Sequence, residues 1–399
     1  MALLRDPPFA FLWTSRVLSN VAFHMLGVAV AWQLYTLTGS ALDLGLVGLV
    51  QFVPMVVLTL IVGQVADRYD RRLITTVCQI VQATAAAALT FAILGRWENK
   101  AGLLTLVALV GAARAFENPS ATALVSDVVA RPSIARAMAW VVSANQTAQI
   151  VGPALGGFLY ALGPVVAYAT ACGLFVLASA CATLVRTRHS ARVPEPVTLA
   201  AVFSGLAFIW SRPVLLGVMT LDLFAVLLGG ATALLPIYAR DILGTGPGGL
   251  GLLRSAPAVG ALATSLFLAQ HPLHRRIGRI LFRAVFVFGA ATVVFGISRT
   301  FVLSLAALCV LGVADVVSVV IRASLVQIRT PDRMRGRVSA VHSLFTGTSN
   351  QLGAFESGVV AALVGAVPAV LIGGLGTIAV AALWMALFPE LRRIRTFEE

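Results

Sequence analysis

The chain has 399 residues, of which 59% are hydrophobic and only 11% are charged, and its mean hydropathy is +0.94. Soluble domains carry about 25% charged residues, so this composition excludes a soluble globular protein and indicates an integral membrane protein. The net charge of +13 does not indicate nucleic-acid binding, because the arginines are spread among short loops rather than gathered on one face.

Apolar runs bounded by glycine, proline or charged residues predict membrane-spanning helices, since a helix needs about 20 apolar residues to cross a bilayer. In the first half of the chain the runs cover residues 10–36, 42–66, 73–94, 102–127, 135–160 and 164–184. In the second half they cover residues 212–238, 246–269, 277–298, 301–326, 336–363 and 366–389. We therefore expect an all-α integral membrane fold of twelve helices, with six-helix halves at residues 1–184 and 212–399 and a cytoplasmic linker at residues 185–211.

The placement of basic residues predicts the orientation of these helices, because cytoplasmic loops of membrane proteins are enriched in arginine and lysine. Most loop arginines fall on the side that holds both termini and the linker. Only Arg96, Lys100, Arg240 and Arg299 fall in the loops of the other side. Both termini are therefore expected in the cytoplasm.

The second half of the chain repeats the first. An offset of 201 residues aligns Arg136 with Arg337 and Gly152 with Gly353, and an offset of 203 aligns Pro54 with Pro257. Matched glycine, proline and arginine are harder to attribute to composition than matched apolar residues. Two halves of the same orientation predict a parallel, pseudo-symmetric repeat about an axis along the membrane normal, an architecture of transporters.

Two short motifs narrow this architecture to a family. The stretch GQVADRYDRR resembles the loop signature between helices 2 and 3 of the major facilitator superfamily, with matches at Gly63, Asp67, Arg68, Arg71 and Arg72. Asp70 stands where that signature usually has glycine. The stretch VGPALGG resembles the signature of the exporter branch, with matches at Gly152, Pro153, Gly156 and Gly157. In that family the first motif is a conformational latch on the cytoplasmic side.

Three longer stretches resemble the bacterial group of this superfamily that contains the enterobactin exporter and the macrolide efflux proteins. They are PPFAFLWTSRVLSNVAFHMLGVAVAWQLYTLTGS, GLLRSAPAVGA and IRTPDRMRGRVSAVHSLF. The resemblance implies a secondary active transporter of the bacterial inner membrane, which exports a small amphipathic drug or siderophore-like metabolite by alternating access and proton antiport. We expect a monomer in the lipid bilayer, with no cofactor, metal ion or nucleic acid.

Charged residues at bilayer depth are candidates for function, because each costs about 2.5 to 3.5 kcal/mol to insert. Arg114 and Glu117 stand three residues apart on one helix, a spacing that permits an ion pair. Asp222 and Asp315 also lie near the predicted midplane, and the repeat aligns Arg114 with Asp315, which permits a salt bridge between the halves.

A carboxylate whose basic partner comes and goes can take up and release a proton. The candidates for proton coupling are therefore Asp222, Glu117, Asp315, Arg114 and His24. Asp222 comes first, because no basic residue lies within a helical turn of it along the chain.

Other polar and aromatic residues are candidates for lining a substrate cavity: Gln51, Gln146, Gln149, Arg254, Asn350, Gln351, Glu356, Trp32 and Phe224. Aromatic residues in membrane helices more often face lipid or pack inside the bundle, so one or two of them at most are expected to contact substrate. Arg254 and Glu356 are expected to form a static ion pair.

Two other classes of function stay open at this point. A lipid or lysolipid translocator of the same fold is the alternative within transport. A membrane enzyme or a sensor is a further alternative, but the chain has no HExxH, GxSxG or phosphate-binding glycine motif.

Overall fold

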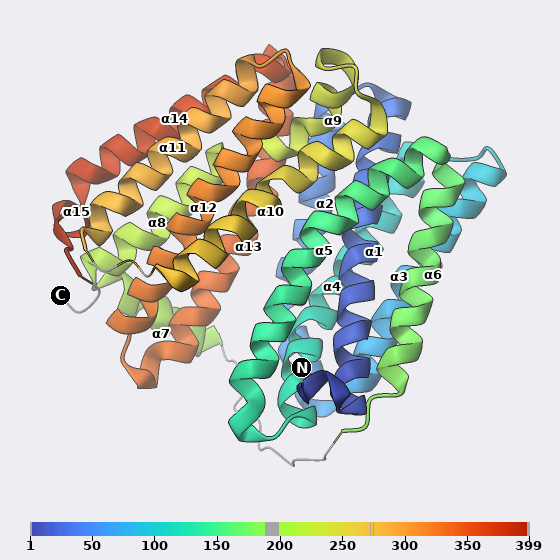
Figure 1. Cartoon of the computed structure of the whole chain (residues 1–399), viewed down its shortest axis with the longest axis horizontal. Helices are drawn as coiled ribbons and strands as arrows, with labels where there is room; N and C mark the ends of the chain where they lie inside the picture. The colour runs from blue at the N-terminus through green and yellow to red at the C-terminus, as the bar shows by residue number, and fades with distance from the viewer. Residues whose placement is uncertain (1, 188–198, 272, 274, 397–399) are drawn as a thin grey trace. The chain divides into compact units, whose positions relative to one another are not determined.

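The computed structural model describes residues 2–187, 199–271, 273 and 275–396, and within them the chain is almost entirely helical, without β-strands. Figure 1 shows the helices along the chain. The all-α membrane fold expected from the sequence is confirmed. Ten helices within the described part are long and apolar enough to cross a membrane, so the expected number of twelve spans stays a prediction.

The described chain divides into two compact units, and unit 1 comprises Met1–Gly39, Val50–Pro196 and Thr245–Ser255. Its helices are α1 (Pro7–Thr38), most of α2 (Ala41–Arg68), α3 (Arg71–Leu94), α4 (Lys100–Val128), α5 (Ile134–Leu162), α6 (Pro164–Thr183) and the start of α10 (Gly246–Gln270).

Local sequence explains where several helices of unit 1 begin and end. Helix α1 begins with two prolines and ends at Gly39, whose φ of 60° is left-handed and whose N–H bonds the carbonyl of Tyr35. Asn99 caps α4 by accepting from the N–H of Gly102 at 2.8 Å.

Unit 2 comprises Ser40–Leu49, Val197–Gly244 and Ala256–Glu399. Its helices are the start of α2, α7 (Leu199–Trp210), α8 (Pro213–Leu228), α9 (Leu235–Ile237), the rest of α10, α11 (Ile277–Ile297), α12 (Phe301–Arg329), α13 (Asp332–Val364), α14 (Ala366–Leu387) and α15 (Pro389–Arg393). Helix α2 therefore begins in unit 2 and continues in unit 1, and helix α10 begins in unit 1 and continues in unit 2. The domain boundaries expected from the sequence stay a prediction.

The same neighbours recur in both units, as the repeat predicts. In unit 1, α1 packs on α4, α5 and α6, and α3 packs on α4 and α6. In unit 2, α8 packs on α12, α13 and α14, and α11 packs on α12 and α14. Both units are therefore built on one pseudo-symmetric plan.

Small residues allow this close packing. In lipid the hydrophobic effect does not drive apolar helices together, so their association depends on close van der Waals contact. Where α3 meets α6, both helices present fully or nearly fully buried alanines, among them Ala85, Ala86, Ala171 and Ala178. Larger side chains form separate clusters, such as Phe9 and Leu124 in unit 1.

One predicted helix is interrupted. The sequence predicts a continuous helix over residues 212–238, whereas α8 ends at Leu228 and the chain continues through a 3-10 turn, α9 and a π-helical turn at Tyr238–Ile242. Gly229 and Gly230 stand at the break. A Cβ on Gly230 would lie 2.6 Å from the hydroxyl of Ser357 on α13, so the backbone passes close to α13 here. Residues 188–198 of the predicted linker lie outside the described residues, and its later part forms α7.

Candidate functional site

A buried polar network surrounds Glu117 in unit 1. The Glu117 carboxylate is 3% exposed and accepts hydrogen bonds from Ser19 on α1 at 2.6 Å, Gln79 on α3 at 3.0 Å and Gln82 on α3 at 2.7 Å. Arg114, one turn earlier on α4, adds an ion pair at 3.2 Å. The pair expected from the sequence is thus confirmed, and the carboxylate is held from three helices.

Arg114 extends the network toward α5. Its second terminal nitrogen donates to Asn20 at 2.6 Å, and Asn20 in turn donates to Asn145 on α5 at 2.8 Å. The guanidinium lies over the ring of Phe23 at 4.4 Å from the centroid, within cation–π distance. His24 stands beside Phe23, with ring centroids 5.5 Å apart.

Two further arginines of unit 1 lie on the same side of α1. Arg16 is 7% exposed and donates to the hydroxyl of Thr122 at 3.2 Å, while its Nε is buried without a hydrogen-bond partner among the described residues. Arg254 on α10 donates to the carbonyl of Gly27 at 3.2 Å. Glu356 contacts the hydroxyl of Ser357 in unit 2, so the expected pair of Arg254 with Glu356 stays a prediction.

The main charged group of unit 2 is an ion pair between Asp222 on α8 and Arg322 on α12. Both side chains are less than a tenth exposed. Thr346 on α13 contacts Asp222 at 3.4 Å, and the Arg322 Nε donates to the Ser318 carbonyl at 3.3 Å. Asp222 has no basic neighbour along its own helix, but the structure supplies one from α12.

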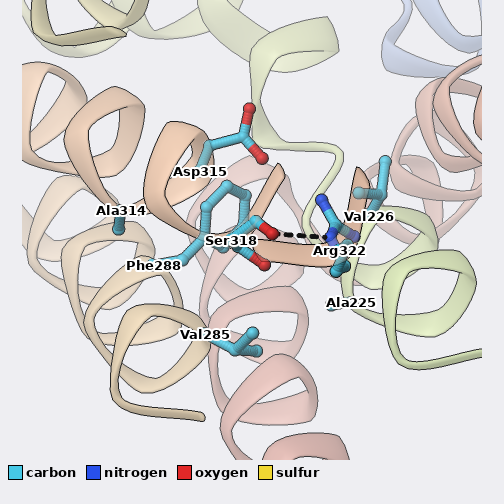
Figure 2. A pocket seen from close by; sticks show the side chains of 8 residues that line it. All are labelled: Ala225, Val226, Val285, Phe288, Ala314, Asp315, Ser318 and Arg322. Carbon is cyan, nitrogen blue, oxygen red and sulfur yellow. Dashed lines mark hydrogen bonds between the residues drawn. The ribbon is translucent and has the colours of Figure 1, made fainter. Parts of the chain in front are cut away.

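Asp315 lines a small pocket of unit 2 that Arg322 of this ion pair also lines (Figure 2). Phe288, Ser318 and Arg322 share the lining with it. The cavity volume of this pocket is about 20 Å³, enough for one or two waters. Among the described residues, the Asp315 carboxylate has no hydrogen-bond or ion-pair partner.

The internal repeat relates the two polar clusters. Ser19 and Asp222 are 203 positions apart, and each bonds a later helix of its own unit: Ser19 bonds α4, and Asp222 bonds α12. Arg114 and Asp315 are 201 positions apart. The equivalent positions therefore differ in charge: unit 1 has Arg114 where unit 2 has Asp315, an acid without a partner among the described residues.

The exporter motif is a helix-packing surface. A Cβ on Gly152 would lie 2.7 Å from the Cβ of His24, and one on Gly156 would lie 2.6 Å from the carbonyl of Met25, both on α1. A Cβ on Gly157 would meet Pro247 and Gly251 of α10. These glycines let α5 approach two helices of unit 1, and Pro153 lies between them inside α5.

The loop motif ties together three helix ends. Arg71 pairs with Asp127 at the end of α4 at 3.0 Å, and Arg72 donates to the carbonyl of Val185 after α6. Asp70 caps α3 by accepting from the N–H of Arg72 at 2.8 Å, which explains an acid where glycine is usual. Arg68 is exposed. The side chain of Asp67 lies outside the described residues, and Gly63 has none, so the latch stays a prediction.

The remaining cavity candidates are scattered through both units. Gln51, Gln146, Trp32 and Gln351 are half-buried, Gln149 is exposed, and Asn350 bonds the carbonyl of Thr346. Phe224 is 39% exposed and packs on Trp384. Within the described residues, no group of histidine, cysteine and acidic side chains could hold a metal ion.

Sequence reasoning missed Arg16 and Arg322. Both stand within apolar helices, Arg322 seven residues after Asp315 and hence on the same face of α12. The rule that marks any charge at bilayer depth as a candidate would have found them.

The fold and its buried charges define a transporter of the major facilitator class. The chain belongs to the family described as transmembrane secretion effector, which matches residues 1–397. The family is one of transporters, so the chain is grouped with transporters rather than enzymes.

Named relatives and solved structures agree with this assignment. The enterobactin exporters EntS of Citrobacter koseri and Shigella flexneri are 26% and 24% identical over 99% of this chain and 95% of theirs. A bacterial homologue of the iron transporter ferroportin, inward-facing, aligns with a TM-score of 0.72 at 17% identity over 99% of this chain and 100% of its own. A bacterial homolog of the human lysosomal transporter Spinster aligns with a TM-score of 0.71 at 13% identity, covering 96% and 95% of the two chains.

Proposed function

We propose that this chain is a proton-coupled exporter of a small amphipathic molecule, siderophore-like or drug-like in kind, which works as a monomer by alternating access. Its relatives named enterobactin exporters, and its membership of a secretion family, support export. The arginine-rich loops support an orientation with both termini in the cytoplasm. In this proposal the two units are the moving bodies and Asp67 belongs to the cytoplasmic latch.

The observation that supports proton coupling is that three buried or partly buried acids differ in their hydrogen-bond and ion-pair partners. Glu117 has four donors and Asp222 an arginine. Protonating either would break interactions that hold helices together. Asp315 lies in a pocket with room for water and has no such partner within the described residues. It can gain and lose a proton without breaking an ion pair, so we assign it the coupling proton, ahead of Asp222, Glu117, Arg114 and His24.

Transport in inside-out membrane vesicles tests the function, with enterobactin as the first probe. An interior-acid gradient should drive accumulation of enterobactin in vesicles that contain this chain, well above the level in vesicles without it. A protonophore should abolish that excess. Accumulation that persists undiminished with the protonophore would contradict proton coupling.

A further inference from the structure

The exposed face of α11 carries arginines at its start and apolar side chains along the rest. Arg279 and Arg283 are four residues apart and therefore share one face of the helix, and Arg276 immediately precedes it. All three arginines are exposed. The same face continues at helical spacing with exposed apolar residues, which are Val287, Ala290, Val294 and Ile297. Because α11 is long and apolar enough to cross a membrane, we expect this face to contact lipid.

Helix α15 brings two more arginines to the start of α11. The N–H of Gly278 donates to the carbonyl of Ile394 at 3.1 Å, and a Cβ on Gly278 would lie 2.9 Å from the carbonyl of Arg392. Helix α15 therefore lies directly against the first turn of α11 (Figure 1). Arg392 and Arg393 on α15 are exposed, so five exposed arginines belong to these two touching segments.

The equivalent end of unit 1 has an acid of its own. Arg71 at the start of α3 pairs with Asp127 near the end of α4 at 3.0 Å. The offset of 201 that aligns Arg114 with Asp315 aligns Asp127 with Ile328, near the end of α12. Unit 2 thus has an apolar residue where unit 1 has a carboxylate. Within the part of the chain that the structure describes, the five arginines of α11 and α15 form no ion pair, and this includes Glu390, the acid of α15.

The depth of Arg283 indicates where its counter-ion lies. Arg283 is six residues into α11, about 9 Å along the axis at 1.5 Å per residue. Long basic side chains at such a depth extend toward the membrane surface, where the charge meets water and lipid headgroups. Arg279, one turn earlier, adds a like charge at a spacing that destabilises a helix. An anion at the membrane surface would remove this repulsion.

We propose that the start of α11, together with α15, binds the headgroup of an anionic phospholipid, with its phosphate on Arg279 and Arg283 and its acyl chains on the apolar residues that follow. Guanidinium groups suit a phosphate because their N–H donors match two of its oxygens. Clusters of about four to eight basic residues beside a membrane span are typical of such recognition. A soluble anion would not use the apolar part of the face. The inference does not depend on the proposed function.

The test is binding to the purified, lipid-depleted full chain in an uncharged detergent, with phosphatidylglycerol, phosphatidylcholine and inorganic phosphate as probes. Phosphatidylglycerol should raise the melting temperature at lower concentration than phosphatidylcholine, and inorganic phosphate should not raise it. Arg279→Gln and Arg283→Gln should each weaken phosphatidylglycerol binding about fivefold, the usual contribution of one basic residue near an anionic lipid surface. Arg299→Gln, which removes an exposed arginine beyond the other end of α11, should bind this lipid like the unmodified chain.

Arg283→Lys keeps the charge, so it should bind phosphatidylglycerol better than Arg283→Gln does, which a purely structural role would not require. Equal affinity for phosphatidylcholine would overturn the proposal. Equal stabilisation by inorganic phosphate would also overturn it, because the arginines would then serve a soluble anion. Undiminished phosphatidylglycerol binding in a chain that carries both Arg279→Gln and Arg283→Gln would overturn it as well.

Discussion

Glu117 is held by more partners than any other acid described in the chain. Four side chains from three helices direct their hydrogens to its two oxygens, and the carboxylate is buried. Charge-assisted hydrogen bonds are stronger than neutral ones. We therefore assign Glu117 a stabilising role, joining α1, α3 and α4.

Glu117→Gln should lower the free energy of unfolding by about 3 kcal/mol, because removing one partner leaves the Arg114 charge buried and unpaired. Thermal unfolding in detergent, followed by intrinsic fluorescence, measures the change. Arg114→Met combined with Glu117→Gln should recover part of the loss, since the unpaired charge is then gone. A melting temperature unchanged in Glu117→Gln would contradict the stabilising role.

The sequence predicts local pairs well and distant pairs poorly. Arg114 and Glu117 are one turn apart on a single helix, so helical geometry alone predicted their contact. Asp222 and Arg322 are 100 positions apart, and their contact depends on how α8 and α12 pack. The sequence therefore places Asp222 first for proton coupling, because the contact with Arg322 is invisible in it, whereas our proposal assigns the proton to Asp315.

The close approach of α5 to α1 depends on glycine. Gly152 and its repeat partner Gly353 face the equivalent helices α1 and α8. A Cβ on Gly353 would lie 2.8 Å from the carbonyl of Leu227. A Cβ on Gly152 would also lie 2.9 Å from the carbonyl of Val21, so both glycines face backbone atoms, which cannot move away as the end of a flexible side chain can.

Gly152→Ala should therefore lower the free energy of unfolding by about 1–3 kcal/mol, the usual cost of overpacking. Gly173→Ala is the matched control, because a Cβ at Gly173 in α6 meets nothing within 4 Å. Alanine is the better helix former, so this variant should be unchanged or slightly more stable. The melting temperatures of the two variants in one detergent give the comparison, and an equal effect at both positions would contradict close packing at Gly152.

Helix positions were largely predictable because apolar runs of membrane length have few alternative structures. The predicted runs at 73–94 and 246–269 correspond to α3 and α10 within a few residues. The break after Leu228 was not predicted. Glycine is common in membrane helices, and only the approach of Gly230 to α13 shows why the helix is interrupted there.

The number of membrane crossings is a property of the whole chain, and it depends on α5 and α13. Neither helix is among the ten that are long and apolar enough to cross a membrane in the described part of the chain. If both cross, the chain has the expected twelve spans, with Leu162 and Leu363 outside and Arg186 in the cytoplasm. If neither crosses, Leu162 lies on the cytoplasmic side and Arg186 on the opposite side, while Leu363 stays outside.

Single cysteines at Leu162 and Leu363 are suited to labelling, since both side chains are strongly exposed, at 76% and 79%. The label at Leu162 distinguishes these cases, and Leu363 is the position that stays outside in both. In a background in which Cys78, Cys172, Cys181 and Cys309 are replaced by serine, a membrane-impermeant maleimide added to cells with permeabilised outer membranes should label both. A cysteine at Arg186, next to the expected linker, should be protected. Protection at Leu162 would contradict a crossing by α5.

The most direct test of the account is gradient-driven transport by Asp315→Asn in proteoliposomes, with enterobactin as probe and Asp241→Asn, at an exposed position of the π-helical turn, as control. We predict that Asp315→Asn loses accumulation driven by an imposed pH gradient but keeps the exchange of labelled for unlabelled enterobactin, which needs no proton. The control should keep both activities. Full gradient-driven accumulation by Asp315→Asn would contradict the assignment of the coupling proton to this pocket.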